Sequence, residues 1–294
     1  MRRIIALLLC ASFSLSSQAT TIVTSIKPLQ LIAAAISAGG ATPIQLLPNG
    51  ASPHDYQLRP SDMRALSQAD LVVWVGPELE SFLAKPLATL PASVQQLALL
   101  PPGPLTSRKL DQHKHSPHDH DNHHDHRGVD PHIWLDPDQG IQIARAISTA
   151  LAKRDNANAA RYQANLARFE QAMAATDQQL RQLLGPLSQR GYFVFHDGYG
   201  YFEAHYGLNH RGALTLNPQR HPGARKLAEI RAQLQQPGTY CLFSEPQFNP
   251  SLVAAIGDGL ELRQGVLDPL GASASSYPEL LLSLGQQFHR CLSP

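Results

Sequence analysis

The sequence alternates short runs rich in β-branched and aromatic residues with stretches of helical periodicity. Before the middle of the chain, this pattern predicts strands over 22–26, 43–47 and 71–75 and helices over 29–38 and 61–69. Strands that alternate with helices in this way are typical of a parallel sheet covered by helices. The first half is therefore expected to form an α/β lobe.

The same alternation returns after the middle of the chain. It predicts strands over 192–196, 213–216, 239–243 and 260–267. A second α/β lobe, with its own mainly parallel sheet, is the expected result.

The longest helical signal lies between these halves. Asp155 or Asn156 can cap its start, and Gly185 and Pro186 end it. Its apolar residues share one face: Tyr162, Leu166, Phe169, Met173, Leu180 and Leu184. A single long helix is a stiff spacer, so we expect a ligand site in the cleft between the lobes and limited closure of that cleft.

The first 19 residues predict a secretory signal peptide. Arg2 and Arg3 precede an apolar run of about 12 residues, which is too short to cross a bilayer of about 30 Å as a helix. Small residues at 17 and 19 fit cleavage after Ala19. Cys10 as a lipid-anchored cysteine is a weaker alternative, because residues 7–9 are all leucine instead of small.

These assignments divide the chain into four parts. Residues 1–19 form the signal peptide, 20–154 the N-terminal lobe, 155–185 the linking helix and 186–294 the C-terminal lobe. Removal of the signal leaves Cys241 and Cys291, and an even number of cysteines in an exported chain predicts a disulfide. Two free buried thiols are the alternative.

The charge balance favours neither of two classes of partner. The chain has 24 basic and 23 acidic residues, a net charge of +1, so no overall positive field favours nucleic acid or an anionic membrane surface.

Histidine is the unusual residue type, with 14 copies, half of them in one short segment. Within 111–128, histidines alternate with aspartates, and too few apolar residues are present to form a core, so we expect a mobile loop within the first lobe. Its imidazoles predict weak, accessory zinc binding. The alternative is a solvated insertion with incidental metal affinity. The histidines are His113, His115, His118, His120, His123, His124 and His126.

There are four other candidate ligands, and three of them fall where predicted strands end, which is where ligands collect in open α/β sheets. His54 follows the strand at 43–47, His196 ends the strand at 192–196, and Asp268 follows the last strand. His132 lies in a loop before a helix. Each alone fits a surface histidine or a turn. Together, three imidazoles and one carboxylate suit tetrahedral Zn²⁺, whereas Mn²⁺ would favour more carboxylate.

Acidic residues near these positions could orient the ligands. A zinc-bound imidazole usually donates its other N–H to an acceptor such as a carboxylate, and Asp197, Glu203 and Glu245 are candidates for that role.

The order of motifs extends this interpretation. The motifs are GASPHDY (50–56) with RPSD (59–62), ADLVVWVG (69–76), DPHIWLDP (130–137) and FHDGYGYF (195–202). They closely resemble those of the metal-binding solute receptors of ABC importers, and within that family the periplasmic zinc receptors. The resemblance covers essentially the whole chain after the signal peptide, including a histidine-rich loop before the second ligand motif.

The resemblance implies two α/β lobes joined by a long rigid helix, with His54, His132 and His196 as metal ligands. Some zinc receptors of this family carry a glutamate just before the first histidine, where this chain has Pro53. Asp268 matches a carboxylate of the wider family and is the predicted fourth ligand, with water as the rival. Manganese receptors tend to carry a carboxylate at the position of His196, so His196 favours zinc.

We therefore predict a periplasmic binding protein, and no enzyme, whose transported ligand is Zn²⁺. Its partners would be the membrane permease and ATPase of an ABC importer, with a periplasmic zinc accessory protein as a further candidate, and we expect a monomer. A manganese receptor or a metal-dependent adhesin of the same family is the alternative. A zinc hydrolase is less favoured, because the chain lacks a His-Glu-x-x-His motif.

Overall fold

The computed structural model describes residues 20–108, 129–215, 223–248 and 250–294. The predicted signal peptide and the seven clustered histidines lie outside the described residues, so the expectations for them stay predictions. Within the described part of the chain, no helix is long and apolar enough to cross a membrane.

The first lobe is built on a four-stranded parallel sheet with the strand order β2–β1–β3–β4. The inner strands β1 and β3 are buried along their whole length, as expected for a parallel sheet with both faces covered. The strands are Ile22–Thr24 (β1), Ile44–Gln45 (β2), Leu71–Trp74 (β3) and Gln95–Ala98 (β4).

Three helices accompany this sheet: Lys27–Ile36 (α1), Pro60–Ser67 (α2) and Ser81–Ala88 (α3). Both predicted helices are present, as α1 and α2, and each has a proline in its first turn, where the missing N–H costs no intrahelical bond. The Asp62 carboxylate also accepts a hydrogen bond from the backbone N–H of Arg59 (2.8 Å) at the start of α2.

The second lobe repeats this arrangement with the order β6–β5–β7–β8. In both sheets the chain leaves the first strand to one side and then returns to its other side, which creates a switch point where ligands commonly bind. The strands are Gly191–His196 (β5), His210–Thr215 (β6), Thr239–Ser244 (β7) and Arg263–Val266 (β8). The helices are Gly200–Tyr206 (α6), Ala224–Leu234 (α7), Pro250–Gly257 (α8) and Tyr277–Leu292 (α9).

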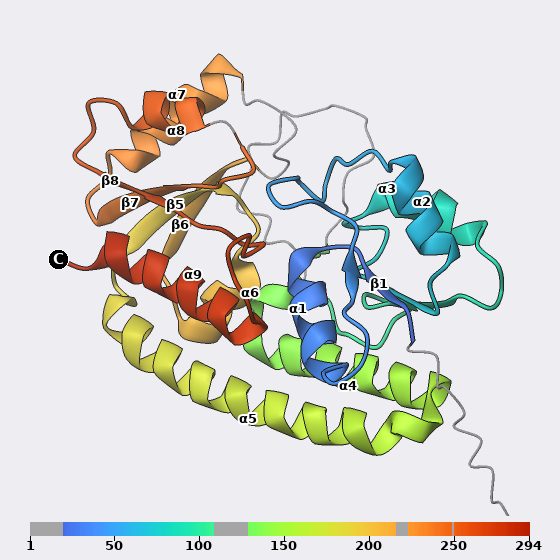
Figure 1. Ribbon diagram of the computed structural model, residues 1–294. Helices are drawn as coiled ribbons and strands as arrows, with labels where there is room; N and C mark the ends of the chain where they lie inside the picture. The colour runs from blue at the N-terminus through green and yellow to red at the C-terminus, as the bar shows by residue number, and fades with distance from the viewer. Residues whose placement is uncertain (1–19, 109–128, 216–222, 249) are drawn as a thin grey trace, which may run out of the picture.

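Helix Pro137–Arg154 (α4) is followed by the long helix Ala159–Leu184 (α5), which connects the lobes and runs beneath both of them (Figure 1). The predicted linking helix is α5, but it starts later than expected, after a short 3₁₀ turn at Asn156–Asn158. Asp155 does not cap it. Its carboxylate instead accepts hydrogen bonds from the Tyr162 hydroxyl and the Asn158 amide, both at 2.7 Å.

One apolar core extends through both lobes. Its buried residues come from α1, α4 and α5 and from α9 of the second lobe, and they include Ile32, Ile147, Met173 and Leu284. Smaller clusters lie in each lobe, one around Val72 and one around Phe193. The lobes are therefore packed against each other as well as tethered.

Buried hydrogen bonds reinforce this contact. A 3₁₀ turn at Ile133–Leu135 leads into α4, and the indole N–H of its Trp134 donates to the carbonyl of Pro269 in the second lobe (2.8 Å). The hydroxyl of Tyr277 in α9 donates to the carbonyl of Trp134 (2.7 Å). Because the turn that follows His132 is bonded to the second lobe, the fold favours limited closure of the cleft.

Cys241 in β7 and Cys291 in α9 form a disulfide, with their Cα atoms 6.1 Å apart. The predicted pairing is confirmed. The bridge ties the last helix to the sheet of the second lobe.

We expect loss of this disulfide to lower the free energy of unfolding by about 3–4 kcal/mol, because the bond constrains the unfolded chain across a separation of 50 residues. Urea unfolding of the oxidised wild type and of the Cys241→Ala/Cys291→Ala double variant measures the difference. Equal midpoints and slopes would show that the bridge contributes no stability.

Candidate metal centre

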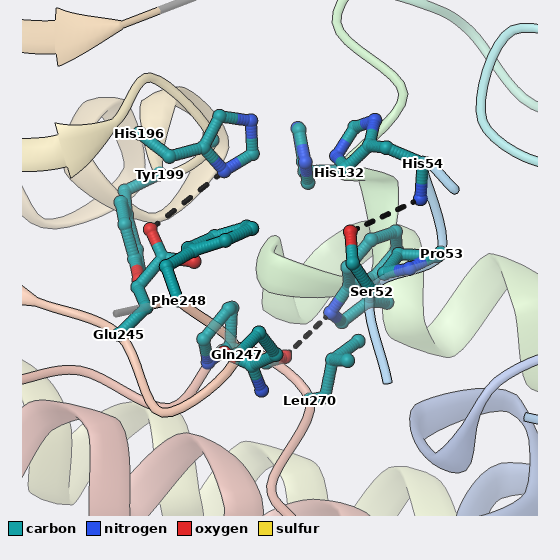
Figure 2. Close-up of a pocket in the computed structure, with 13 residues that line it drawn as sticks. Ser52, Pro53, His54, His132, His196, Tyr199, Glu245, Gln247, Phe248 and Leu270 are labelled. Carbon is teal, nitrogen blue, oxygen red and sulfur yellow. Dashed lines mark hydrogen bonds and ion pairs between the residues drawn. The ribbon is translucent and has the colours of Figure 1, made fainter. Parts of the chain in front are cut away.

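Three of the predicted ligands, His54, His132 and His196, meet between the lobes (Figure 2). The ring centroid of His132 lies 4.8 Å from that of His196 and 5.4 Å from that of His54, and the His54 and His196 centroids are 5.0 Å apart. Each ring offers a nitrogen within 4.8 Å of the other two. The tertiary fold therefore converges all three imidazoles on one point.

Each histidine reaches this point from a different element. His196 is the last residue of β5, at the switch point of the second sheet, and His54 lies in the loop after β2. His132 directly precedes the 3₁₀ turn that leads into α4. A Cβ atom on Gly198 would lie 2.9 Å from Cε1 of His196 and 3.1 Å from Nε2 of His132, so the bare backbone there permits the two rings to converge.

The surroundings of His132 prepare it as a ligand. Its Nδ1 lies 2.8 Å from Oδ1 of Asp130, and the same oxygen accepts from the backbone N–H of His132 at 3.0 Å. A proton on Nδ1 leaves a lone pair on Nε2, which is buried without a hydrogen-bond partner among the described residues. Burial, and then the neighbouring His196, hold the pKa of His132 well below 6.5, so the ring is neutral at pH 7.

Asp130 was not among the predicted orienting residues, although its position two residues before His132 was a visible signal. Of those that were predicted, Glu245 lies after β7 with Oε1 3.7 Å from Nδ1 of His196, which is beyond hydrogen-bond length. The Glu203 carboxylate accepts from the Tyr192 hydroxyl at 2.9 Å and lies 3.1 Å from Nδ1 of His210. These two partners lie in the second lobe, and neither belongs to the group of three converging histidines.

Asp197 adjoins His196, and burial raises the pKa of its carboxyl. No described hydrogen bond or ion pair joins this carboxylate to a ligand ring. The orienting roles of Asp197, Glu203 and Glu245 stay predictions.

Asp268 is the predicted ligand that the structure does not bring into the group. Its carboxylate accepts from the backbone N–H groups of Leu270, Gly271 and Ala272 at 3.1, 3.1 and 2.7 Å. The Gln247 side-chain amide donates to it at 3.1 Å. The backbone amides hold Asp268 in the turn that follows β8, and its role as the fourth ligand stays a prediction.

The space at the three rings is small and mostly apolar. Its free volume is about 20 Å³, and both lobes line it, with Pro53, Trp134, Phe248 and Leu270 among the walls. A single water needs about 10–15 Å³ by the same measure. The pocket therefore has room for an ion with one small ligand.

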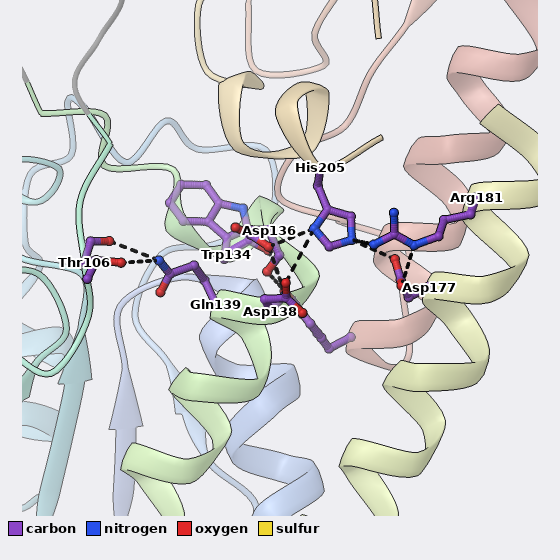
Figure 3. A network of polar contacts seen from close by, with 9 residues as sticks. Thr106, Trp134, Asp136, Asp138, Gln139, Asp177, Arg181 and His205 are labelled. Atoms are coloured by element: carbon purple, nitrogen blue, oxygen red, sulfur yellow. Dashed lines mark hydrogen bonds and ion pairs between the residues drawn. The ribbon is translucent and has the colours of Figure 1, made fainter. Parts of the chain in front are cut away.

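Asp136, Asp138 and His205 form a second group whose ligand atoms lie close together (Figure 3). Nδ1 of His205 is 3.4 Å from Asp136 and 3.8 Å from Asp138, and its Nε2 is 2.8 Å from Asp177. Arg181 lies 2.7 Å from the same Nε2. These charges compensate one another, so the group is explained as a polar bridge between α4, α5 and α6.

Two α/β lobes joined by one long helix, with imidazoles of both lobes around a space for one ion, define a two-lobed metal-binding receptor. Residues 22–291 match the family model described as ZnuA, zinc-uptake complex component A, periplasmic. The chain therefore belongs to the ZnuA family, which is a family of solute receptors and not of enzymes.

Individual relatives agree over nearly the full length. The chain is 45% identical to the high-affinity zinc uptake system protein ZnuA of Yersinia pestis, over 98% of this chain and 95% of the relative. A crystal structure of ZnuA superposes with a TM-score of 0.81 at 27% identity, covering 94% of this chain and 100% of the other. A zinc-bound ZnuA deletion mutant gives 0.80 at the same identity, covering 94% and 99%.

The polar bridge at His205 predicts a pH-dependent contribution to stability. The hydrogen bond to Asp136 and the contacts with Asp177 raise the pKa of His205 above 6.5. The contribution of His205 to the free energy of unfolding is therefore full below pH 6.5 and is lost as the pH rises through the folded-state pKa of this residue. At pH 5.5 we expect His205→Gln to lower the free energy of unfolding by about 1–2 kcal/mol, and the deficit to narrow at alkaline pH.

Urea unfolding at several pH values checks this, with His289→Gln as the control, because the described contact of the His289 ring is with Ser293, the residue that follows the same helix. Burial lowers the pKa of His210, but the nearby Glu203 outweighs it and raises this pKa to about 9. The wild type and both variants keep His210, so its pH dependence is the same in all three proteins. A deficit that stays constant with pH would contradict a charged His205.

Proposed function

We propose that this protein captures Zn²⁺ between its lobes in the periplasm and delivers it to the membrane permease of an ABC importer, which an ATPase drives. The observation that carries the proposal is the convergence of three imidazoles, contributed by both lobes, on a space for a single ion. Membership of the ZnuA family supports zinc as the cargo and the importer as the partner.

The donor set supports zinc on chemical grounds. Three imidazole nitrogens suit the tetrahedral shell of Zn²⁺, whereas Mg²⁺ and Mn²⁺ favour carboxylate and carbonyl oxygen. A neutral His132 needs no deprotonation before it binds the ion, so its lowered pKa keeps it available near neutral pH.

Asp268 stays the predicted fourth ligand in this proposal, with water as the rival, and its carboxylate already accepts four hydrogen bonds. Binding the ion through one carboxylate oxygen would compete with these hydrogen bonds, at a cost of about 1–3 kcal/mol for each backbone amide left buried and unpaired. A water-bound position also leaves a place at which an acceptor on the permease can begin to take the ion.

Export and accessory binding complete the proposal. Residues 1–19 direct the chain to the periplasm and are removed there. The clustered histidines of segment 111–128 bind further Zn²⁺ weakly, with affinity falling as imidazoles protonate near pH 6.5, and raise the local supply of ion near the cleft.

We expect His54→Ala, His132→Ala and His196→Ala each to weaken the tight zinc site by at least about 100-fold, more than the 10- to 100-fold loss typical of residues outside the metal shell. Competition between the mature protein and a chelator at pH 7 measures the affinity. His289→Ala, far along α9, is the matched control and should bind like the wild type.

Two outcomes of the same titration would contradict the proposal. Displacement of Zn²⁺ by Mn²⁺ at equal concentration would contradict the assignment of zinc as the cargo. Wild-type affinity in all three alanine variants would show that these histidines do not form the tight site. Asp268→Asn distinguishes the fourth ligand. A loss comparable with the histidine variants would assign Asp268 to the ion, whereas near wild-type affinity supports water.

Deletion of residues 111–128 should lower the total number of zinc ions bound while one tight site remains, because the three ligands of that site lie outside the segment. Calorimetric titration of the full-length mature protein and of the deletion variant checks both quantities. Loss of the tight site on deletion would contradict this division between tight and accessory binding.

A further inference from the structure

Asp130 lies where three parts of the molecule meet. It is 2% exposed and stands two residues before the ligand His132. Its backbone forms an isolated antiparallel bridge with Arg108, in which the N–H of Asp130 donates to the carbonyl of Arg108 (2.8 Å). These two residues flank the histidine-rich segment, so the base of that segment is joined to the residue that contacts a zinc ligand.

The second lobe supplies the third part. The hydroxyl of Tyr201 in α6 donates to the carbonyl of Asp130 (3.0 Å) and accepts from the N–H of Arg108 (2.7 Å). One buried hydroxyl of the second lobe thus forms hydrogen bonds with the backbone of both residues of the bridge in the first lobe. This contact fixes where the backbone of Asp130 lies relative to α6.

The residue before Tyr201 permits this close approach. A Cβ atom on Gly200 would collide with the guanidinium of Arg108 and would lie 3.2 Å from Oδ2 of Asp130. Glycine at this position lets α6 lie against the guanidinium and the carboxylate at once, whereas a side chain there would require the Arg108 guanidinium to move. Helix α6 of the second lobe therefore packs directly against the Arg108–Asp130 bridge.

We propose that Asp130 is a positioning residue for zinc capture and that Tyr201 holds it in place from the opposite lobe. This inference rests on the proposed function. Oδ1 of Asp130 accepts from both the backbone N–H and Nδ1 of His132, so it places the ring proton on Nδ1 and aims the Nε2 lone pair at the ion. Zinc affinity then depends on the seating of α6 against the bridge.

Chelator competition at pH 7 tests the proposal on the full mature chain, with Zn²⁺ alone as the probe. We expect Asp130→Asn, which keeps the shape and removes the charge, to weaken zinc binding by about 10- to 100-fold. Tyr201→Phe removes one neutral hydrogen-bonding hydroxyl and should weaken it by about 3- to 10-fold. Tyr206→Phe removes a hydroxyl from the same helix, at 7% exposure, and should bind like the wild type.

A second measurement separates positioning from general stability. ¹⁵N NMR of the metal-free proteins should show His132 with its proton on Nδ1 in the wild type and a shift toward the Nε2–H form in Asp130→Asn. Thermal melts confirm that each variant is folded, and Tyr201→Phe keeps the proposal testable if Asp130→Asn does not fold.

Wild-type affinity in both variants, with an unchanged His132 tautomer, would overturn the proposal. The same is true if Tyr206→Phe weakens binding as much as Tyr201→Phe. Failure of the wild type itself to bind Zn²⁺ would instead overturn the proposed function, while the NMR tautomer would still report whether Asp130 orients the ring.

Discussion

The packing of the two lobes into one apolar core is the constraint on which the metal centre depends. His54 and His132 belong to the first lobe and His196 to the second, and ligand distances in a metal site must be correct to within about 0.2 Å. Flexible lobes would lose part of the binding free energy in bringing the rings together. Here the turn that follows His132 is bonded to Pro269 and Tyr277 of the second lobe, so the rings are already within 4.8–5.4 Å of one another.

The ligand imidazoles and His205 respond to pH in opposite ways. Acid protonates ligand imidazoles and weakens zinc binding, and the low pKa of His132 delays its own protonation. The same acid protonates His205 and strengthens the bridge to Asp136, which lies four residues after His132. The contact between α4, α5 and α6 is therefore kept at acidic pH.

Sequence reasoning could predict the fold class and three ligands because both depend on local patterns. Parallel strands read as apolar runs such as 71–75, and a ligand histidine at a strand end is recognisable from its place after such a run. The strand Gln95–Ala98 escaped prediction because two glutamines and an alanine at an edge carry no strand signal. Helix α5 starts at Ala159 because Tyr162 and Asn158 engage the side chain of the expected cap.

By itself, the sequence determined the alternation of strands and helices, the long helix and the histidines near the ends of predicted strands, since each is written in neighbouring residues. The cysteine pairing followed from the even number of cysteines expected in the exported chain. Only the tertiary structure decided which carboxylates face the imidazoles. Asp268 is held by backbone amides of residues 270–272, Glu203 faces Tyr192 and His210, and Asp130 contacts His132. The physical reason is that a carboxylate binds the nearest donors, and which donors are nearest depends on contacts between segments far apart in the chain.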